Sequence, residues 1–588
     1  MLTLPVKKTK IVCTLGPATD DDEVLAAMIE ASMDIARLNF SHGNYEDHDR
    51  RIEQIKRVRS KLGAPIALML DTSGPEIRVG KFAGGCAQIE TGQTFILTTD
   101  DIEGDNTRAH VNYKNILSDV IPGTRVMLDD GIAELRAERV EGANIICTVI
   151  NGILLKDNKS LNLPEIELSM PYVSAKDIED IKFGVSRGVD FIAASFVSKA
   201  EDVLDVRRLL EQNGGHDIRI IAKIENRRGV NNIDEILRVA DGIMIARGDM
   251  GVEIPFEELP TIQKLLIKKT YRSGRMVITA TQMLESMIEN PRPTRAEITD
   301  IANAVYDGTS AVMLSGETSV GAYPTKAVDT MSRIVRCTES DIDYVKRFGN
   351  NDSVEKNITD AISHATCTTA HDLEAAAIIT VTETGNTARM ISKFRPACPI
   401  ISCTNDERSW RQLNLSWGVV PAMVKKLETT DELFENAVKS AVATGVVKTG
   451  DLVVITAGVP VGISGTTNTL KVVIVGDVLV SGKGNGVLSE CYGNLCVCKN
   501  EAQALKDFKD GDILVIPFTT NKSLQILKKA KGIITEEAGL SSHAAIVGLT
   551  LEIPVITSAD AATDILKSGA TVTIDCAHGL VYSGITRF

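Results

Sequence analysis

Eight short apolar runs, separated by stretches with helical periodicity, constrain the fold of this 588-residue chain more than any other feature. The runs occupy residues 11–15, 35–38, 66–71, 190–196, 219–224, 242–246, 276–281 and 311–314. Most are separated by stretches with apolar residues at helical spacing, such as 23–31, 45–62, 201–211, 256–271 and 295–306. Eight strands with intervening helices are typical of a (β/α)₈ TIM barrel, an α/β fold, and we predict that architecture.

A region rich in β runs interrupts the barrel pattern between the third and fourth strands. It covers residues 76–164, with strand-like runs at 94–98, 125–128 and 145–150. We predict a small inserted β-barrel domain that acts as a lid and excludes water from the active-site end of the barrel. The catalytic barrel then comprises residues 1–75 and 165–337.

Two more regions follow the barrel. Alternating strands and helices resume over residues 338–477, which predicts an open α/β domain. A Gly/Ser-rich segment at 481–486 leads into a last unit, residues 478–588, which we expect to be a separate β/α domain.

Composition narrows the class of partner and the location. The net charge of −14 argues against nucleic acid as a main partner, so an anionic ligand must be held by local positive charge. No apolar run approaches the roughly 18 residues of a membrane helix, and the start lacks a secretory core. We therefore expect a cytoplasmic protein with no membrane partner and with its eleven cysteines reduced. Lys7, Lys8 and Lys10 read as a solvated N-terminal face.

Polar residues gather where the second and third apolar runs end. Because strand side chains alternate, Arg37, Asn39 and Ser41 should project the same way. Asp71 and Thr72 follow the next run and add a carboxylate and a hydroxyl. One guanidinium, neutral oxygens and a carboxylate suit a phosphate beside a small oxygen-liganded cation.

The fifth to seventh runs end in a second polar group. Lys223 and Glu225 share a face at the end of the fifth run, and Asp249 follows a glycine turn after the sixth. Glu225 and Asp249 form a two-carboxylate site suited to Mg²⁺ or Mn²⁺. Gly248 lets backbone N–H groups approach an anion, and Thr281 offers a hydroxyl. Each feature alone is more often a strand-end salt bridge or cap; together on one rim they favour an active site.

Residues 10 to about 475 resemble the pyruvate kinase family. The resemblance rests on motifs at 14–18, 37–43, 71–78, 128–131, 194–197, 223–226, 246–251, 280–287, 291–297 and 313–318. It implies phosphoryl transfer from phosphoenolpyruvate to ADP, giving ATP and pyruvate, in glycolysis. It also implies a homotetramer.

The resemblance assigns a role to each polar residue of the rim. Arg37 and Lys223 would neutralise the transferring phosphoryl group. Glu225 and Asp249 would hold Mg²⁺ or Mn²⁺, and backbone groups around Gly248 and Asp249 would hold the substrate carboxylate. Thr281 lies where a proton reaches the enolate carbon through water. The family's nucleotide contacts match Asn39, His42, Arg78 and Lys159.

The resemblance also implies a monovalent cation. The family's K⁺ site matches Asn39, Ser41, Asp71 and Thr72. Glu76 goes with K⁺ dependence in this family, whereas a Lys at that place supplies the charge itself, so we expect K⁺ activation. Ser73 stands where the family usually has Lys, which predicts weakened handling of ADP.

In residues 338–477, a loop resembles the family's effector phosphate loop. It consists of Thr382, Thr384, Gly385 and Thr387, at a strand-to-helix junction that suits a phosphate. An ordinary capped helix start is the alternative. Glu383 disfavours a bisphosphate, so AMP or a sugar monophosphate is the favoured effector.

The last unit resembles the swivelling phosphohistidine domain of phosphoenolpyruvate-utilising enzymes. His543 matches the phosphorylated histidine, but Ala538 replaces a glycine of the motif, and we favour a structural or regulatory role. A dikinase or synthase that works through phospho-His543 would need an ATP-grasp-type domain, for which no segment is found. A Mg²⁺-dependent enolpyruvate aldolase would not explain the lid, Lys223 with Arg78, or the K⁺ site. A non-catalytic effector-binding role is conceivable for the last two domains alone.

Overall fold

The computed structural model describes residues 7–349, 357–425, 430–458, 467–476, 478–486 and 491–585. The chain divides into two compact units. The first comprises Met1–Glu355, Thr382–Ala397 and Thr404–Met423, and the second comprises Lys356–Val381, Cys398–Cys403 and Val424–Phe588. Each unit is described by itself below.

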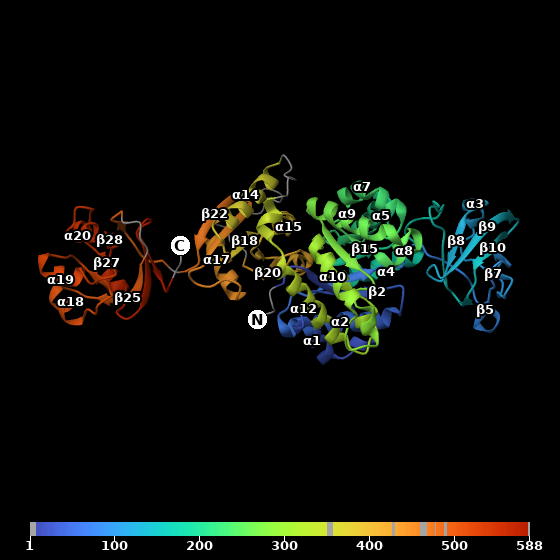
Figure 1. Cartoon of the computed structure of the whole chain (residues 1–588), viewed down its shortest axis with the longest axis horizontal. Coiled ribbons are helices and arrows are strands. Elements are labelled where there is room, and N and C mark those ends of the chain that lie inside the picture. The colour runs from blue at the N-terminus through green and yellow to red at the C-terminus, as the bar shows by residue number, and fades with distance from the viewer. Residues whose placement is uncertain are drawn as a thin grey trace. The chain divides into compact units, whose positions relative to one another are not determined.

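A closed barrel of eight parallel strands forms the centre of the first unit (Figure 1). Its strands are β1 (Lys10–Thr14), β2 (Ile35–Asn39), β3 (Ala67–Asp71), β13 (Phe191–Ala194), β14 (Arg219–Ile224), β15 (Gly242–Ala246), β16 (Met276–Ala280) and β17 (Ala311–Leu314). Every predicted apolar run became one of these strands, and the predicted α/β barrel is confirmed.

Helices follow the strands of the barrel, and capping residues mark the ends of several of them. They are α1 (Asp22–Glu30), α2 (Tyr45–Leu62), α4 (Ala175–Arg187), α5 (Ala200–Gln212), α6 (Arg227–Asn231), α7 (Ile233–Val239), α8 (Arg247–Glu253), α9 (Leu259–Arg272), α10 (Arg295–Asp307), α11 (Gly316–Ser319), α12 (Pro324–Asp341) and α13 (Tyr344–Gly349). In α10, Thr294 and Glu297 form a capping box, and Gly308 ends the helix at φ 95°. Residues 256–258 form a separate 3₁₀ turn before α9.

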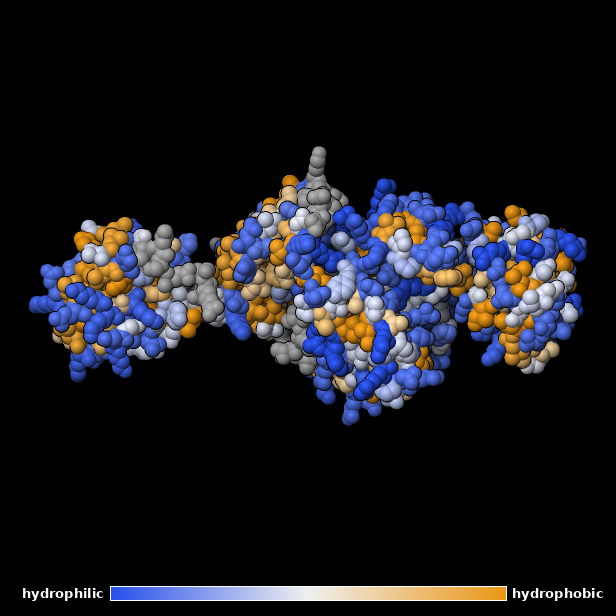
Figure 2. Space-filling view, in the orientation of Figure 1, coloured by the Kyte–Doolittle hydropathy of each residue, from blue (hydrophilic) through white to orange (hydrophobic). Residues whose placement is uncertain are grey.

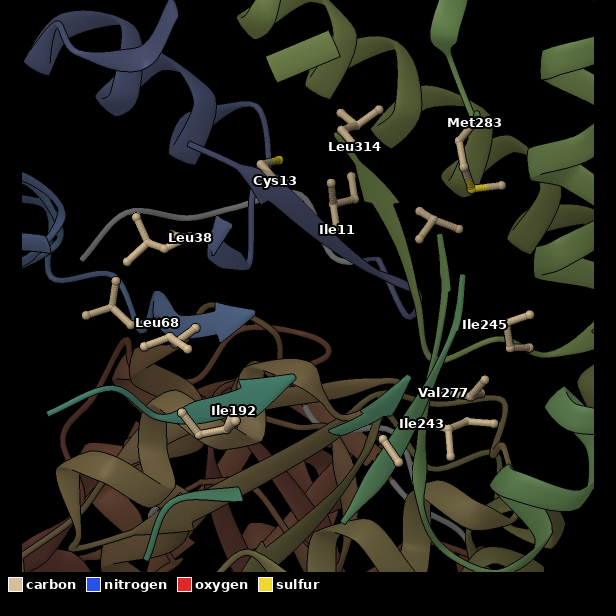
Figure 3. Close-up of a cluster of buried hydrophobic side chains, with 14 of the residues drawn as sticks. Ile11, Cys13, Leu38, Leu68, Ile192, Ile243, Ile245, Val277, Met283 and Leu314 are labelled. Carbon is tan, nitrogen blue, oxygen red and sulfur yellow. The ribbon is translucent and has the colours of Figure 1, made fainter. Parts of the chain in front are cut away.

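Alternating side chains of the barrel strands supply two hydrophobic cores. Ile11 and Cys13 belong to the cluster between strands and helices, whereas Val12 belongs to the cluster inside the barrel. Figure 3 shows part of the outer cluster, with Leu38, Leu68, Ile192 and other buried residues drawn from several strands. On β2 the outer cluster takes Ala36 and Leu38, so Arg37 has the inward parity of Ile35. The same alternation turns Lys223 inward, because Ile221 is in the inner cluster.

The insertion after β3 has its own sheet and core. Its seven-stranded sheet has the order β4 (Ile77–Arg78), β12 (Ser160–Asn162), β8 (Arg125–Leu128), β9 (Ala133–Glu141), β10 (Asn144–Asn151), β6 (Thr94–Thr98) and β7 (Arg108–His110). Strands β5 (Cys86–Gln88) and β11 (Leu154–Lys156) pair separately, and α3 (Ile116–Asp119) is the insertion's α-helix. A core cluster that includes Phe95, Leu135 and Val149 fills the insertion.

The N-terminal lysines are not a solvated face, and that expectation is wrong. Lys7 and Lys10 are only 6% and 4% exposed. Lys7 pairs with Asp34, and Lys10 Nζ donates to Val419 O at 2.7 Å. Burial lowers the pKa of Lys10 to about 8. These lysines are therefore part of the base of the barrel.

The first unit also contains α15 (Asn386–Lys393), α16 (Glu407–Gln412) and β20 (Val419–Met423). Figure 2 shows hydrophilic residues over much of the visible face of this unit, interrupted by small hydrophobic patches. Among the described residues, no helix is both long and apolar enough to cross a membrane.

The second unit holds two sheets. In the first, β19 (Ile400–Thr404), β18 (Ala377–Val381) and β21 (Leu452–Gly458) are parallel, β22 (Thr467–Ile474) is antiparallel, and α14 (Ile358–Asp372) and α17 (Thr430–Ala443) accompany them. The second sheet has the order β23 (Val478–Ser481), β30 (Leu580–Ser583), β29 (Thr571–Asp575), β25 (Cys491–Val497), β26 (Ile513–Ile516), β27 (Gly532–Thr535), β28 (Val555–Thr557) and β24 (Lys483–Gly484). Helices α18 (Glu501–Asp507), α19 (Leu524–Leu527), α20 (His543–Leu551) and α21 (Ala562–Ile565) complete that part.

Candidate active site

A cleft of about 940 Å³ opens where the barrel strands end and the β insertion begins. It is lined by residues from both parts of the first unit. Nine predicted site residues line it: Arg37, Asn39, Ser41, His42, Arg78, Lys159, Lys223, Glu225 and Asp249. The structure thus brings together side chains that lie up to 212 positions apart in the sequence, from 37 to 249.

Asp71 is the centre of a buried charge network at the floor of the cleft. Its carboxylate is fully buried and accepts from Arg37 Nε at 2.7 Å, while Lys223 Nζ lies 3.1 Å from its other oxygen. Burial by itself would raise the pKa of Asp71, but the charges of Arg37 and Lys223 outweigh it and lower the pKa. Arg37 also donates to Thr14 Oγ1 at 2.9 Å. Two cations are therefore held rigidly at the bottom of the cleft.

Glu225 is a buried carboxylate beside this network. It is 1% exposed, its Oε1 lies 2.9 Å from Lys223 Nζ, and its Oε2 accepts from Phe196 N at 2.6 Å. Burial, together with the charge of Asp249, raises the pKa of Glu225 to about 7 despite the opposing charge of Lys223. For Lys223, burial works against protonation, but the carboxylates of Asp71 and Glu225 raise its pKa above the ordinary value.

Ser195 is a site residue that the sequence reasoning did not single out. Lys223 Nζ donates to Ser195 Oγ at 2.7 Å, and Ser195 Oγ donates to Thr72 O at 2.7 Å. Tyr172 in turn donates to Ser195 O at 2.8 Å. The available signal was its position, because Ser195 directly follows a buried strand, as Asp71 and Thr72 end or follow β3.

Thr281 directly follows β16 and adopts φ 65°, a conformation rare for a β-branched residue. Its hydroxyl accepts from Gly248 N at 2.8 Å and donates to Ala280 O at 2.7 Å. Arg247 secures this turn by donating to Thr281 O at 2.6 Å, and it pairs with Asp300. Such strain persists only where surrounding contacts determine it, and it is common at functional sites. Asp249 lies in the first turn of α8, where a glycine turn was expected.

The predicted monovalent site lies at the ends of β2 and β3. Asn39 is the last residue of β2, so the strand alternation invoked for Ser41 does not reach it, and that argument is wrong. Ser41 nevertheless lines the cleft with Asn39, because Ser41 N donates to Asn39 Oδ1 at 3.1 Å in a tight turn. Thr72 Oγ1 accepts from Ser195 N at 3.2 Å.

Comparisons with known proteins agree with this geometry. Models for the pyruvate kinase barrel domain, the pyruvate kinase alpha/beta domain and the mobile domain of PEP-utilising enzymes match residues 6–328, 360–473 and 508–579. The pyruvate kinase of Geobacillus stearothermophilus is 48% identical over 581 residues, which cover 98% of this chain and 99% of the relative. That of Sporosarcina psychrophila is 47% identical over 583 residues, with the same coverage.

The chain belongs to the pyruvate kinase family. The crystal structure of a pyruvate kinase from Cryptosporidium parvum superimposes with a TM-score of 0.76 at 39% identity. The match covers 80% of this chain and 98% of that chain. The resemblance drawn from the motifs is therefore confirmed, including the match of the last region to the mobile domain of PEP-utilising enzymes.

Of the residues that match the family's nucleotide contacts, Arg78 and Lys159 belong to the insertion, whereas Asn39 and His42 lie at the end of β2 and just after it. Arg78 pairs with Glu76 at 2.5 Å and donates to Asn158 O at 2.9 Å. Lys159 pairs with Asp129 at 2.6 Å. Both cations already have acidic partners, so a nucleotide phosphate would have to compete with Glu76 and Asp129 for them.

Ser73, which stands where this family usually has Lys, has a cation beside it after all. Lys176, in α4, donates to Ser73 Oγ at 2.9 Å and to Phe40 O at 2.6 Å. It also pairs with Asp180 at 2.8 Å, which accepts from Tyr45. The ammonium therefore ties the loop after β2 to the loop after β3.

The loop that resembles the family's effector loop precedes α15. Gly385 takes φ 77°, its N–H donates to Thr382 Oγ1 at 3.0 Å, and it gives the helix no side-chain cap. Thr384 O accepts from Arg219 and Arg389, each at 3.2 Å. A role of Thr382, Thr384, Gly385 and Thr387 in effector binding stays a prediction.

His543 is the first residue of α20, in the second unit. Its Nε2 donates to Asn521 Oδ1 at 3.1 Å, and the Thr519 hydroxyl donates to its Nδ1 at 2.8 Å. Both ring nitrogens are thus held by neutral side chains, and the helix N-cap is Ser542.

Proposed function

We propose that the chain transfers the phosphoryl group of phosphoenolpyruvate to ADP, which gives ATP and pyruvate, as a step of glycolysis in the cytoplasm. The observation that supports this most is the pair of buried cations, Arg37 and Lys223, fixed on either side of Asp71 in one cleft. The membership of the family and the full-length relatives named pyruvate kinase agree with it.

In the proposed reaction, Arg37 and Lys223 bind the phosphoryl group and offset the charge that spreads over its oxygens in the transition state. Fixed positions matter here, because cations that need no rearrangement stabilise a transition state more than mobile ones. The hydrogen bonds from Lys223 to Ser195 and from Arg37 to Thr14 hold both side chains in place before substrate binds.

Glu225 and Asp249 fit a divalent cation. Glu225 is buried with Lys223 Nζ 2.9 Å from its Oε1, and burial, followed by the nearby carboxylate of Asp249, raises its pKa. The described residues offer no group of three or more His, Cys, Asp or Glu, so substrate and water oxygens would complete the shell, as Mg²⁺ prefers. When bound there, Mg²⁺ or Mn²⁺ would supply positive charge to phosphate and enolate oxygens.

A monovalent cation fits the oxygens of Asn39, Ser41, Asp71 and Thr72, which gather at the ends of β2 and β3. Asp71 already balances Arg37 and Lys223, so its charge is shared among several cations. We propose K⁺ for this site, because Glu76 brings a negative charge to the cleft where a Lys would replace the ion.

Thr281 would position the proton that reaches the enolate carbon. Its hydroxyl is fixed by Gly248 N and Ala280 O, and its backbone is held by Arg247. The substrate carboxylate would bind the backbone beside Asp249. Gly248 N–H, which now donates to Thr281 Oγ1, would then donate to the carboxylate instead.

The direct test mixes the full chain with phosphoenolpyruvate, ADP and Mg²⁺, with K⁺ or with tetramethylammonium, and follows pyruvate through lactate dehydrogenase. We expect turnover that depends on both Mg²⁺ and K⁺. No pyruvate under either condition would contradict the proposed function, whereas undiminished turnover in tetramethylammonium would contradict only the K⁺ site.

Regulation and assembly belong to the same proposal. A phosphorylated effector, AMP or a sugar monophosphate, would bind the loop of Thr382, Thr384, Gly385 and Thr387. We also propose a homotetramer, and a structural or regulatory role for the last region rather than phosphoryl transfer through His543.

A further inference from the structure

A small cavity in the first unit, away from the cleft, is lined by cations. Its lining residues come from the end of α9, the base of strands β16 and β17, and the region of α15. They are Tyr271, Gly274, Arg275, Met276, Ser310, Arg389, Ser392, Lys393, Arg395, Ser416 and Trp417. Four of these residues are cationic, four carry hydroxyl groups, and none is acidic.

Arg395 is a deeply buried member of this group of cations. It is 3% exposed, and no carboxylate forms an ion pair with it among the described residues. Its guanidinium lies 4.7 Å from the Trp417 ring and 5.1 Å from the Tyr271 ring, and its terminal nitrogens donate to Ser392 O at 2.7 Å and Gly308 O at 3.1 Å. Because burial removes its hydration, the pKa of Arg395 falls to about 9.

Two buried donors at this cavity have no acceptor. Arg395 Nε and the Ser416 hydroxyl make no hydrogen bond within the described chain, and Ser416 is only 2% exposed. A buried unsatisfied donor destabilises the folded state, and a charged one does so more strongly. Native structures satisfy such groups with protein, water or an ion, and buried charges are normally paired.

The size of the cavity limits what could satisfy them. Its volume of about 10 Å³ has room for one occupant near the size of a water molecule. A water would accept a hydrogen bond but would leave the charge of Arg395 uncompensated. Phosphate and carboxylates are too large for this space.

We propose that this cavity binds a single halide ion, chloride under ordinary conditions, which accepts from Arg395 Nε and the Ser416 hydroxyl. Its negative charge would also offset Arg275 and Arg389. Arg395 donates to Gly308 O and to Ser310 Oγ at the start of β17. By holding Arg395 in place, the ion would therefore stabilise the contact between the segment after α15 and the residues just before β17.

The test uses the full chain and bromide as a heavier halide. Crystals soaked in sodium bromide should give an anomalous peak in the cavity within hydrogen-bond distance of Arg395 Nε. In solution, the unfolding temperature should rise with chloride or bromide and saturate, while sodium acetate at the same ionic strength should give no saturating rise. A cavity that holds only water, or equal effects of chloride and acetate, would overturn the proposal.

Variants give a second readout. Ser416→Ala should weaken the apparent halide affinity about tenfold, because a hydrogen bond to a charged group is lost. Ser332→Ala removes a hydroxyl in α12 that is also buried and has no hydrogen-bond partner in the described part of the chain. Ser332 does not line the cavity, so this variant should leave the halide affinity unchanged. Equal affinities of the two variants would also overturn the proposal.

Discussion

The barrel cleft and the surroundings of His543 differ in charge: the cleft contains buried ion pairs, whereas the ring of His543 has neutral partners. In the cleft, Arg37, Lys223, Asp71 and Glu225 are all at least nine-tenths buried and interlocked by ion pairs of 2.7–3.1 Å. His543 is half-buried, and among the described residues its ring hydrogen-bonds only to the neutral side chains of Thr519 and Asn521.

This difference indicates which of the two sites, the cleft or His543, is suited to phosphoryl transfer. A transferring phosphoryl group carries negative charge that must be met by fixed positive charge. The cleft has two such cations in place, whereas the ring of His543 has no hydrogen-bonded cation among the described residues. We therefore assign the transfer to the cleft and none of it to His543.

The largest expected effect is at Lys223. Lys223→Met should lower turnover by about 10³-fold, because one preorganised cation aimed at the transition state is lost. Lys182→Met, on the surface of α4, is the matched control and should keep full activity. A circular dichroism spectrum and an unfolding temperature check that the variant is folded. A loss of less than tenfold in a folded variant would move the chemistry away from the cleft.

The next effect concerns K⁺. Glu76→Lys places an ammonium group in the cleft where Glu76 now pairs with Arg78. We expect turnover in tetramethylammonium to rise at least about tenfold over that of the wild type, since the ammonium replaces the ion. Glu90→Lys, exposed in the insertion, should stay dependent on K⁺. If both variants respond alike, Glu76 does not govern the cation site.

The third prediction concerns Lys176, beside Ser73, and the binding of ADP. Lys176→Ala breaks its bonds to Phe40 O and Ser73 Oγ, so the loops after β2 and β3 keep only the weaker direct bond from Ser73 Oγ to Phe40 O at 3.3 Å between these two residues. The KM for ADP should rise about fivefold with a smaller change in kcat, because positioning rather than transition-state charge is lost. Lys182→Ala on the same helix is the control. A fall in kcat with an unchanged KM would show a catalytic contribution instead.

A smaller effect is the pH dependence of stability at the edge of the cleft. Burial, together with the carboxylate of Glu165, raises the pKa of Glu253 to about 7, above its unfolded value of about 4.3. The folded chain then binds more protons between these values, so this group's contribution to stability falls as pH rises through that window.

Glu253→Gln should therefore match the wild type near pH 4 and be more stable at pH 8, by about 1–3 kcal/mol. Unfolding temperatures of both chains across that range provide the measurement. Glu257→Gln, at an exposed position nearby, should show no such crossover. Equal stability of Glu253→Gln and wild type at pH 8 would contradict the raised pKa.

The sequence predicted the barrel well because its strands are buried and apolar. Strand β15 occupies Gly242–Ala246, as the run itself indicated, and helix α2 covers Tyr45–Leu62. The same alternation placed Arg37 and Lys223 toward the inside of the barrel. Local periodicity is enough for such residues because strand geometry determines their direction.

What the sequence could not predict depends on contacts between distant segments. Lys10 reaches Val419, 409 positions away, and nothing near Lys10 indicates a buried partner. Lys176 reaches Ser73 across 103 positions, which is why the missing Lys at position 73 looked uncompensated. Ser41 joined the cleft through a turn rather than a strand.

The steady-state rate of His543→Ala beside the wild type, with phosphoenolpyruvate, ADP, Mg²⁺ and K⁺, decides whether the barrel cleft alone carries out the transfer. We expect the two rates to be equal within about twofold, and no phosphohistidine by mass spectrometry after incubation with phosphoenolpyruvate. A rate loss greater than tenfold in a folded variant, together with a phosphorylated His543 in the wild type, would contradict the assignment of the transfer to the barrel cleft.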